Sequence, residues 1–162
     1  VYGSGKTIAE IAATGQQLPK KRQLIIVPTT TGTGSEVTNV AVFNFLEKGT
    51  KAGLAYPAMF ADQVYLIADL AKTMPYKVFA TSSIDALVHA IESYLSPKAT
   101  SFSKIFSVAA MKTIIQGYLQ IILAEQVGQT PQGQQLQKFL EASTMAGVAF
   151  GNAGCGPVHA LA

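Results

Sequence analysis

The feature that most constrains the fold of this chain is a change in the pattern of apolar residues near residues 69–75. Before this point, short apolar or β-branched segments alternate with stretches rich in Gly, Pro and Thr, which is typical of strands joined by turns. After it, apolar residues recur at helical spacing over three long segments. We therefore expect a short helix within 4–14, strands at 24–27, 37–45, 51–56 and 64–67, and helices at 75–95, 101–124 and 134–149. This order predicts an α/β part, residues 1–70, followed by an all-α part, residues 71–162.

Composition narrows the class of protein. Apolar residues make up 49% of the chain and charged residues only 13%, so the sequence predicts a folded protein. The net charge of +3 is scattered apart from Lys20-Lys21-Arg22, which we interpret as a solvated turn, so no nucleic-acid partner is expected. No apolar run reaches the roughly 20 residues of a membrane span. Cys155 is the only cysteine, which excludes a disulfide within the chain and fits a reducing cytoplasm.

One helical segment carries a pair of metal-binding residue types. Asp85 and His89 are four residues apart, so they lie on one face of the expected 75–95 helix. Oxygen and nitrogen donors placed in this way suit Fe, Zn, Mn or Co, although such a pair alone is more often hydrogen-bonded or solvated. His159 is the only other histidine and follows a glycine-rich stretch, 151–156, that we expect to end the preceding helix. It would complete a site with three protein ligands and an open position, or serve simply as a core or capping residue.

A second candidate site follows the apolar run at 24–27, which we expect to be a strand buried on both faces. Residues 28–36 are rich in Thr and Gly, and they leave the strand at its carboxyl end, where α/β sheets bind ligands. Hydroxyl groups there can donate hydrogen bonds to phosphate or carboxamide oxygens. An ordinary Thr-rich turn is the alternative. A third segment, Gly3-Ser4-Gly5-Lys6-Thr7, ends like a phosphate-binding loop, and a P-loop nucleotide-binding protein is therefore a rival interpretation.

Three motifs in one order resemble the iron-containing (group III) alcohol dehydrogenases. They are Pro28-Thr-Thr-Thr-Gly-Thr-Gly-Ser-Glu-Val-Thr38, Asp85-Ala-Leu-Val-His-Ala-Ile-Glu-Ser-Tyr94 and Gly156-Pro-Val-His-Ala-Leu-Ala162. The resemblance spans residues 24–162. It implies the dehydroquinate-synthase-like fold of that family, with 1–70 as the C-terminal part of a dinucleotide-binding α/β domain and 71–162 as the first part of a helical metal-binding domain.

The same resemblance implies functional residues and cofactors. Asp85, His89 and His159 match metal ligands, and Thr29, Thr30, Thr33 and Lys51 match positions that contact the cofactor. The implied cofactors are Fe²⁺, or Zn²⁺ or another divalent metal, together with NAD or NADP. The implied activity is hydride transfer between the nicotinamide and an alcohol or aldehyde, in a cytoplasmic homo-oligomer. A fourth ligand and the family's pyrophosphate-binding turn are expected outside this chain, so we expect the chain alone to be an internal fragment that lacks activity.

Within the family, residues 76–85, 92–99 and 151–154 resemble the 4-hydroxybutyrate dehydrogenases, which interconvert 4-hydroxybutyrate and succinate semialdehyde. Lactaldehyde and propanediol oxidoreductases are the near alternatives. A distal carboxylate on the substrate needs a positive partner, and Lys98 at the end of the metal helix is the candidate. The alternative for Lys98 is a surface lysine near a helix C-terminus, where cations are favoured.

Overall fold

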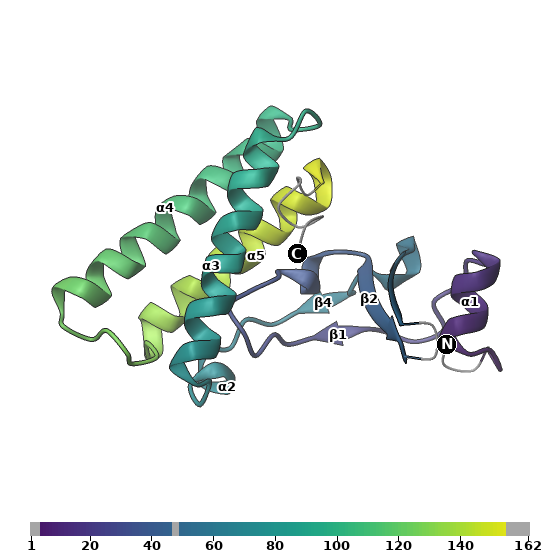
Figure 1. Ribbon diagram of the computed structural model, residues 1–162, viewed down its shortest axis with the longest axis horizontal. Helices are drawn as coiled ribbons and strands as arrows, with labels where there is room; N and C mark the ends of the chain where they lie inside the picture. The colour runs from purple at the N-terminus through teal and green to yellow at the C-terminus, as the bar shows by residue number, and fades with distance from the viewer. Residues whose placement is uncertain (1–3, 47–48, 155–162) are drawn as a thin grey trace.

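The computed structural model describes residues 4–46 and 49–154. Within these residues lie two small sheets, five α-helices and the 3₁₀ helices η1 and η3. In chain order they are α1 (Ile8–Thr14), β1 (Ile25–Ile26), η1 (Ser35–Val37), β2 (Val40–Phe45), β3 (Thr50–Ala55), η3 (Pro57–Met59), β4 (Gln63–Val64), α2 (Ala68–Ala71), α3 (Tyr76–Leu95), α4 (Ser101–Leu123) and α5 (Gly133–Ala153). Figure 1 shows the three long helices on one side of the molecule and the strands with α1 on the other.

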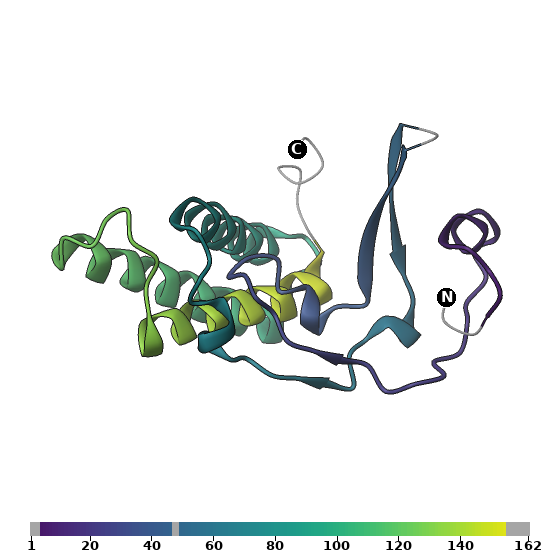
Figure 2. The same cartoon turned by 90° about the horizontal axis from the view of Figure 1, so that it is seen from below.

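The α/β part contains a parallel pair and a hairpin. β1 and β4 run parallel, with Ile25 opposite Gln63. β2 and β3 pair antiparallel, from Val40 opposite Ala55 to Phe45 opposite Thr50. Figure 2 shows this hairpin standing away from the long helices. The order of expected strands is therefore confirmed, and the loop at 28–36 does follow a parallel strand.

The expectation that residues 24–27 form a strand buried on both faces is wrong for this structure. Side chains of Leu24 and Ile25 are 37% and 50% exposed. The physical reason is that, within residues 4–46 and 49–154, β1 pairs with β4 alone and so forms the edge of a two-stranded sheet. The segment is held instead through Asp62, whose carboxylate accepts hydrogen bonds from Leu24 N at 2.7 Å and from Lys20 Nζ at 2.9 Å.

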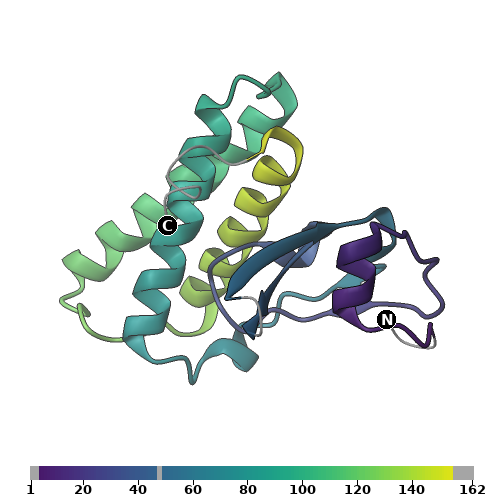
Figure 3. The ribbon, with the colours of Figure 1, turned by 45° about the vertical axis from the view of Figure 1, so that its right-hand side comes forward.

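Helix α1 begins and ends as its sequence dictates. The Thr7 hydroxyl accepts a hydrogen bond from Glu10 N, and Thr7 N donates one to Glu10 Oε2 at 2.7 Å, which is a capping box. Gly15 ends the helix in the left-handed conformation at φ 62°. In Figure 3 the helix lies beside the hairpin. A mostly apolar cavity of about 370 Å³ lies between them, lined by side chains that include Ile11, Phe43 and Leu54.

The core of the helical part lies where α3, α4 and α5 meet. Phe79 on α3 and Phe139 on α5 are buried, and their rings meet edge to face at 4.8 Å between centroids. Tyr118 on α4 closes the cluster, and its hydroxyl lies 2.6 Å from Ser83 Oγ. Gly117 permits the close approach of α4 to α5, because a methyl group there would lie 2.6 Å from Phe139 Cζ.

Only part of the apolar surface of α4 is buried. Phe102, Ile105 and Ile122 all have helical spacing, yet they are 60%, 66% and 58% exposed. The face that packs on the other helices is made mostly of smaller side chains, namely Ser103, Ser107, Ala110, Ile114, Gly117 and Ile121. Small residues occupy the buried face because α4 packs closely on α5, as the contact of Gly117 with Phe139 shows.

Helix α4 is also long and apolar enough to cross a membrane by length and composition. Core helices of soluble proteins pass the same test, and one face of α4 packs on α3 and α5. The absence of a membrane partner therefore stays a prediction, as does the division into two domains near residues 69–75.

Candidate metal and cofactor site

Helix α3 presents the predicted metal ligands in the geometry that the sequence implies. Asp85 and His89 both lie within this unbroken helix, one turn apart on one face. Asp85 is partly buried and the His89 side chain is only 6% exposed. A carboxylate oxygen and an imidazole nitrogen form a donor set that suits iron, zinc or a similar divalent ion, so these two residues fit the implied metal.

The end of α5 meets this face of α3. The Phe150 ring packs on the His89 ring at 4.6 Å between centroids, and Ser96 Oγ donates a hydrogen bond to Ala153 O at 2.6 Å. Gly154 ends α5, and His159 follows five residues later, outside the described residues.

Only two of the three predicted ligands therefore belong to the described part of the chain. Within residues 4–46 and 49–154, no three His, Cys, Asp or Glu side chains come together as a metal site. This result fits the expectation that the third ligand is His159, but it does not test it. The role of His159 stays a prediction.

The Thr-rich loop divides into buried and exposed residues. Thr31 is fully buried, and its hydroxyl lies 3.0 Å from Ser82 Oγ on α3, one turn before Asp85. Thr29, Thr30 and Thr33, the three predicted cofactor contacts, are exposed. Thr33 Oγ1 accepts a hydrogen bond from Ser35 N at 3.3 Å. The predicted cofactor contacts Thr29, Thr30 and Thr33 are thus accessible to solvent, on a loop that contacts α3 through Thr31.

The other two predicted site residues, Lys51 for the cofactor and Lys98 for the substrate, lie outside the Thr-rich loop. Lys51 is exposed on β3 opposite Asn44, and the described contacts do not bring it to the Thr-rich loop. The hairpin end at Val40 and Ala55 is four residue pairs away, which corresponds to about 13 Å along the strand. Lys98 is exposed in the turn after α3, and its backbone N–H donates to Ser96 Oγ at 3.2 Å.

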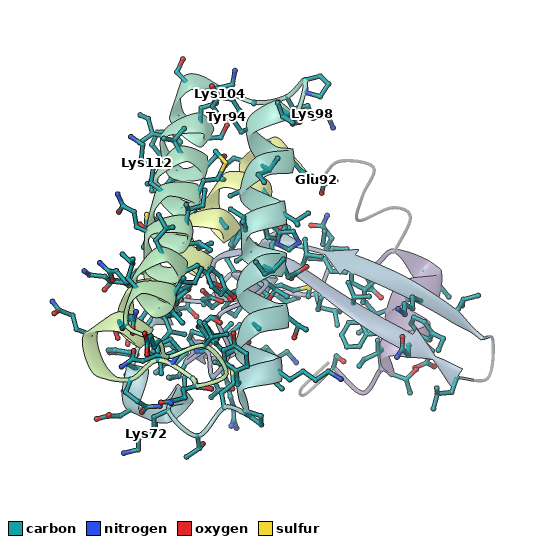
Figure 4. The ribbon with its side chains drawn as sticks, turned by 60° about the vertical axis from the view of Figure 1, so that its left-hand side comes forward. Lys72, Glu92, Tyr94, Lys98, Lys104 and Lys112 are labelled. Carbon is teal, nitrogen blue, oxygen red and sulfur yellow. The ribbon has the colours of Figure 1, made fainter. Side chains whose placement is uncertain are left out.

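Figure 4 places Lys98 and Glu92 on the side of α3 that faces away from α4. Glu92 is only 7% exposed and lies one turn after His89, although it forms no three-residue metal-binding cluster with Asp85 and His89. Sequence reasoning missed both Glu92 and Phe150. Glu92 had a detectable signal, because it continues the spacing of Asp85 and His89 on the same face. Phe150 had none, because its contact with His89 joins segments 61 residues apart.

The segment Ser4–Thr7 serves as the start of α1. Thr7 caps the helix, and Lys6 Nζ donates a hydrogen bond to the Gln16 side chain. The P-loop alternative thus gains no support from the structure.

The fold, an α/β part followed by a helical part, is one found in a class of oxidoreductases, and the chain belongs to the iron-containing alcohol dehydrogenase family. Residues 1–68 match the model of the iron-containing alcohol dehydrogenases, and residues 79–162 match that of the family's C-terminal domain. The family resemblance and the fold predicted from sequence are thereby confirmed, and a family named for its iron agrees with the predicted metal.

Similar proteins are enzymes of this family. The chain is 47% identical to 4-hydroxybutyrate dehydrogenase of Clostridium kluyveri over 144 residues, covering 89% of this chain and 38% of that enzyme. It is 36% identical to 1-propanol dehydrogenase PduQ of Salmonella typhimurium, covering 85% of this chain and 36% of that one. The sulfoacetaldehyde reductase of Bifidobacterium kashiwanohense, solved with NAD⁺, superposes with a TM-score of 0.82 at 29% identity, covering 96% of this chain and 40% of that one. The chain thus spans well under half the length of these relatives.

Proposed function

We propose that the protein is a metal- and NAD-dependent alcohol dehydrogenase whose substrates are 4-hydroxybutyrate and succinate semialdehyde. The observation that carries the proposal is the pairing of Asp85 and His89 on α3, with the Thr-rich loop attached to the same helix at Ser82. The similarity to the Clostridium 4-hydroxybutyrate dehydrogenase supports the substrate. The similarity to 1-propanol dehydrogenase keeps a short uncharged alcohol as the alternative substrate.

The overall reaction converts alcohol and NAD⁺ into aldehyde, NADH and a proton: the alcohol carbon would give up a hydride, and the hydroxyl proton would pass to solvent. When bound, the nicotinamide accepts the hydride and the divalent metal supplies Lewis-acid polarisation of the substrate oxygen. The chain's own residues hold these groups in place. Asp85, His89 and His159 would hold the metal, and the exposed hydroxyls of Thr29, Thr30 and Thr33 would donate hydrogen bonds to the cofactor. Burial of His89 against Phe150 keeps water from one side of the metal face.

The test uses the full-length protein loaded with Fe²⁺ or Zn²⁺. Formation of NADH is measured with 4-hydroxybutyrate, 1-butanol, 1,2-propanediol and 1,3-propanediol as parallel substrates, and succinate semialdehyde is identified as the product. The proposal expects metal-dependent NADH formation with the highest kcat/KM for 4-hydroxybutyrate. A higher kcat/KM for an uncharged alcohol would overturn the substrate. Absence of metal-dependent turnover with all four would overturn the function.

A further inference from the structure

Helix α5 carries a groove of small residues in which the Thr-rich segment lies. Ser143, Gly147 and Gly151 are spaced at four-residue intervals, so they share one helix face. Ser143 Oγ donates a hydrogen bond to Gly32 O at 2.9 Å. A methyl group added at Gly147 would lie 2.8 Å from Gly34 Cα, and one added at Gly34 would lie 2.6 Å from Gly147 Cα. The two backbones therefore touch, which only glycine at both positions permits.

Two part-buried polar contacts also hold the Thr-rich segment against the helices. Thr144 Oγ1 donates a hydrogen bond to Glu36 Oε1 at 2.6 Å, and Glu36 is only 4% exposed. Thr31 fixes the other end of the loop to Ser82 on α3. The loop is thus held by α5 and α3 together, the helices that also bear Phe150 and the Asp85–His89 pair.

We propose that Gly147, Ser143 and Thr144 are positioning residues that set the distance between the cofactor loop and the metal face. This inference rests on the proposed dehydrogenase function. Hydride transfer needs its two carbons within about 3–3.5 Å, and a misplacement of 1 Å can cost roughly 100-fold in rate. Carbon atoms normally approach to about 3.5–4.0 Å. A methyl group at Gly147 therefore displaces Gly34, and with it Thr33, by roughly 1 Å from α5.

The chain offers a matched control for this change. Gly151 lies one turn further along the same face of α5, and a methyl group there meets only Thr38 Cγ2 at an ordinary 3.6 Å. Gly147→Ala and Gly151→Ala thus make the same chemical change, and both gain the same helix propensity. Only the first forces two backbones apart.

The experiment compares both variants with the wild-type full-length protein. NADH affinity is measured by fluorescence, bound metal by elemental analysis, and the primary deuterium isotope effect with alcohol labelled at the reacting carbon. We expect Gly147→Ala to weaken NADH binding about tenfold, to lower kcat/KM by 10- to 100-fold and to increase the isotope effect, with metal content retained. Gly151→Ala should stay within twofold of the wild type in each measurement.

Thr144→Val provides a second test of the inference in case the Gly147→Ala variant fails to fold. It keeps the side-chain shape and removes the hydrogen bond to Glu36, so NADH affinity should fall severalfold without loss of metal. Unchanged NADH affinity in Thr144→Val and in any folded Gly147→Ala would overturn the inference. A wild-type protein that binds no NADH would instead overturn the proposed function, so the two failures are distinguishable.

Discussion

The ring of His89 on α3 packs on the ring of Phe150 in the last turn of α5, with 4.6 Å between the ring centroids. Because α5 leads towards His159, this contact fixes where the chain leaves α5 relative to the Asp85–His89 pair. It also fixes the plane of the imidazole, since a packed ring cannot turn freely. The contact therefore holds one proposed metal ligand, His89, against the end of α5 through a side chain that is itself no ligand.

This relationship predicts how metal retention depends on the two residues. In the full-length protein, His89→Ala and His159→Ala should each remove nearly all bound metal, because each deletes a proposed ligand. Phe150→Leu should keep the ligands but loosen their orientation, and it should weaken metal binding by about 10-fold, the lower end for groups that orient ligands. Metal content after dialysis against graded chelator measures all three. Phe102→Leu, at an exposed position on α4, is the control. Full metal content in His159→Ala would contradict the proposed site.

The Thr-rich loop gives a prediction that separates binding from stability. Thr29→Ala and Thr30→Ala should each weaken NAD binding by about 0.5–1.5 kcal/mol, the value of a lost neutral hydrogen bond, and leave thermal stability unchanged. Thr31→Ala should do the reverse, because Thr31 is buried on Ser82 rather than exposed. Calorimetric titration with NAD and thermal unfolding measure the two effects. Equal NAD affinity in wild type, Thr29→Ala and Thr30→Ala would remove both hydroxyls from the cofactor site.

The carboxylate of Asp62 predicts a pH effect in the α/β part. The hydrogen bond from Leu24 N, followed by that from Lys20, lowers the pKa of Asp62 below its usual value. A carboxyl group with a lowered pKa in the folded state stabilises the fold above its unfolded pKa, and this contribution is lost as the pH falls through the folded pKa. Asp62→Asn should therefore reduce the loss of stability between about pH 5 and pH 2. Unfolding by urea at several pH values measures this, and identical pH profiles for both proteins would contradict it.

Local patterns account for most of what sequence predicted correctly. Helical spacing, Pro75 and the turn at 96–99 locate α3, and the i, i+4 pair on it follows directly. What sequence could not supply are contacts between distant segments. The expected helix at 134–149 contains Gly147, but nothing local to the sequence shows that Gly34 lies against it. The helix also continues through Gly151 to Ala153, and Gly154 caps it. The contact of Gly117 with Phe139 is likewise one between distant segments.

The contact at Gly117 makes a prediction about stability. Gly117→Ala would place a methyl group 2.6 Å from Phe139 Cζ, and Phe139 is only 2% exposed, so its ring has little room to move. Overpacking costs about 1–3 kcal/mol, which exceeds the gain of up to about 1 kcal/mol in helix propensity. We expect a lower unfolding temperature in calorimetry. Gly151→Ala, where the added methyl group meets no close contact, should raise it slightly. A stabilised Gly117→Ala protein would show that α4 shifts freely on α5.

The last prediction concerns Lys98 and the choice of substrate. Lys98 is exposed at the end of the metal helix, where its ammonium group could pair with the distal carboxylate of 4-hydroxybutyrate while the alcohol end lies at the metal face. The full-length protein and its Lys98→Met variant are assayed with 4-hydroxybutyrate and with 1-butanol. If Lys98 holds the carboxylate, the variant should lose about 10- to 100-fold in kcat/KM for the acid, equivalent to about 1.5–3 kcal/mol for a charged hydrogen bond, and keep its rate with butanol. Lys104→Met is the matched control, because Lys104 lies on the Tyr94 ring near the same end of α3. Equal losses on both substrates would remove Lys98 from the site, and its role would then be that of a cation at a helix C-terminus.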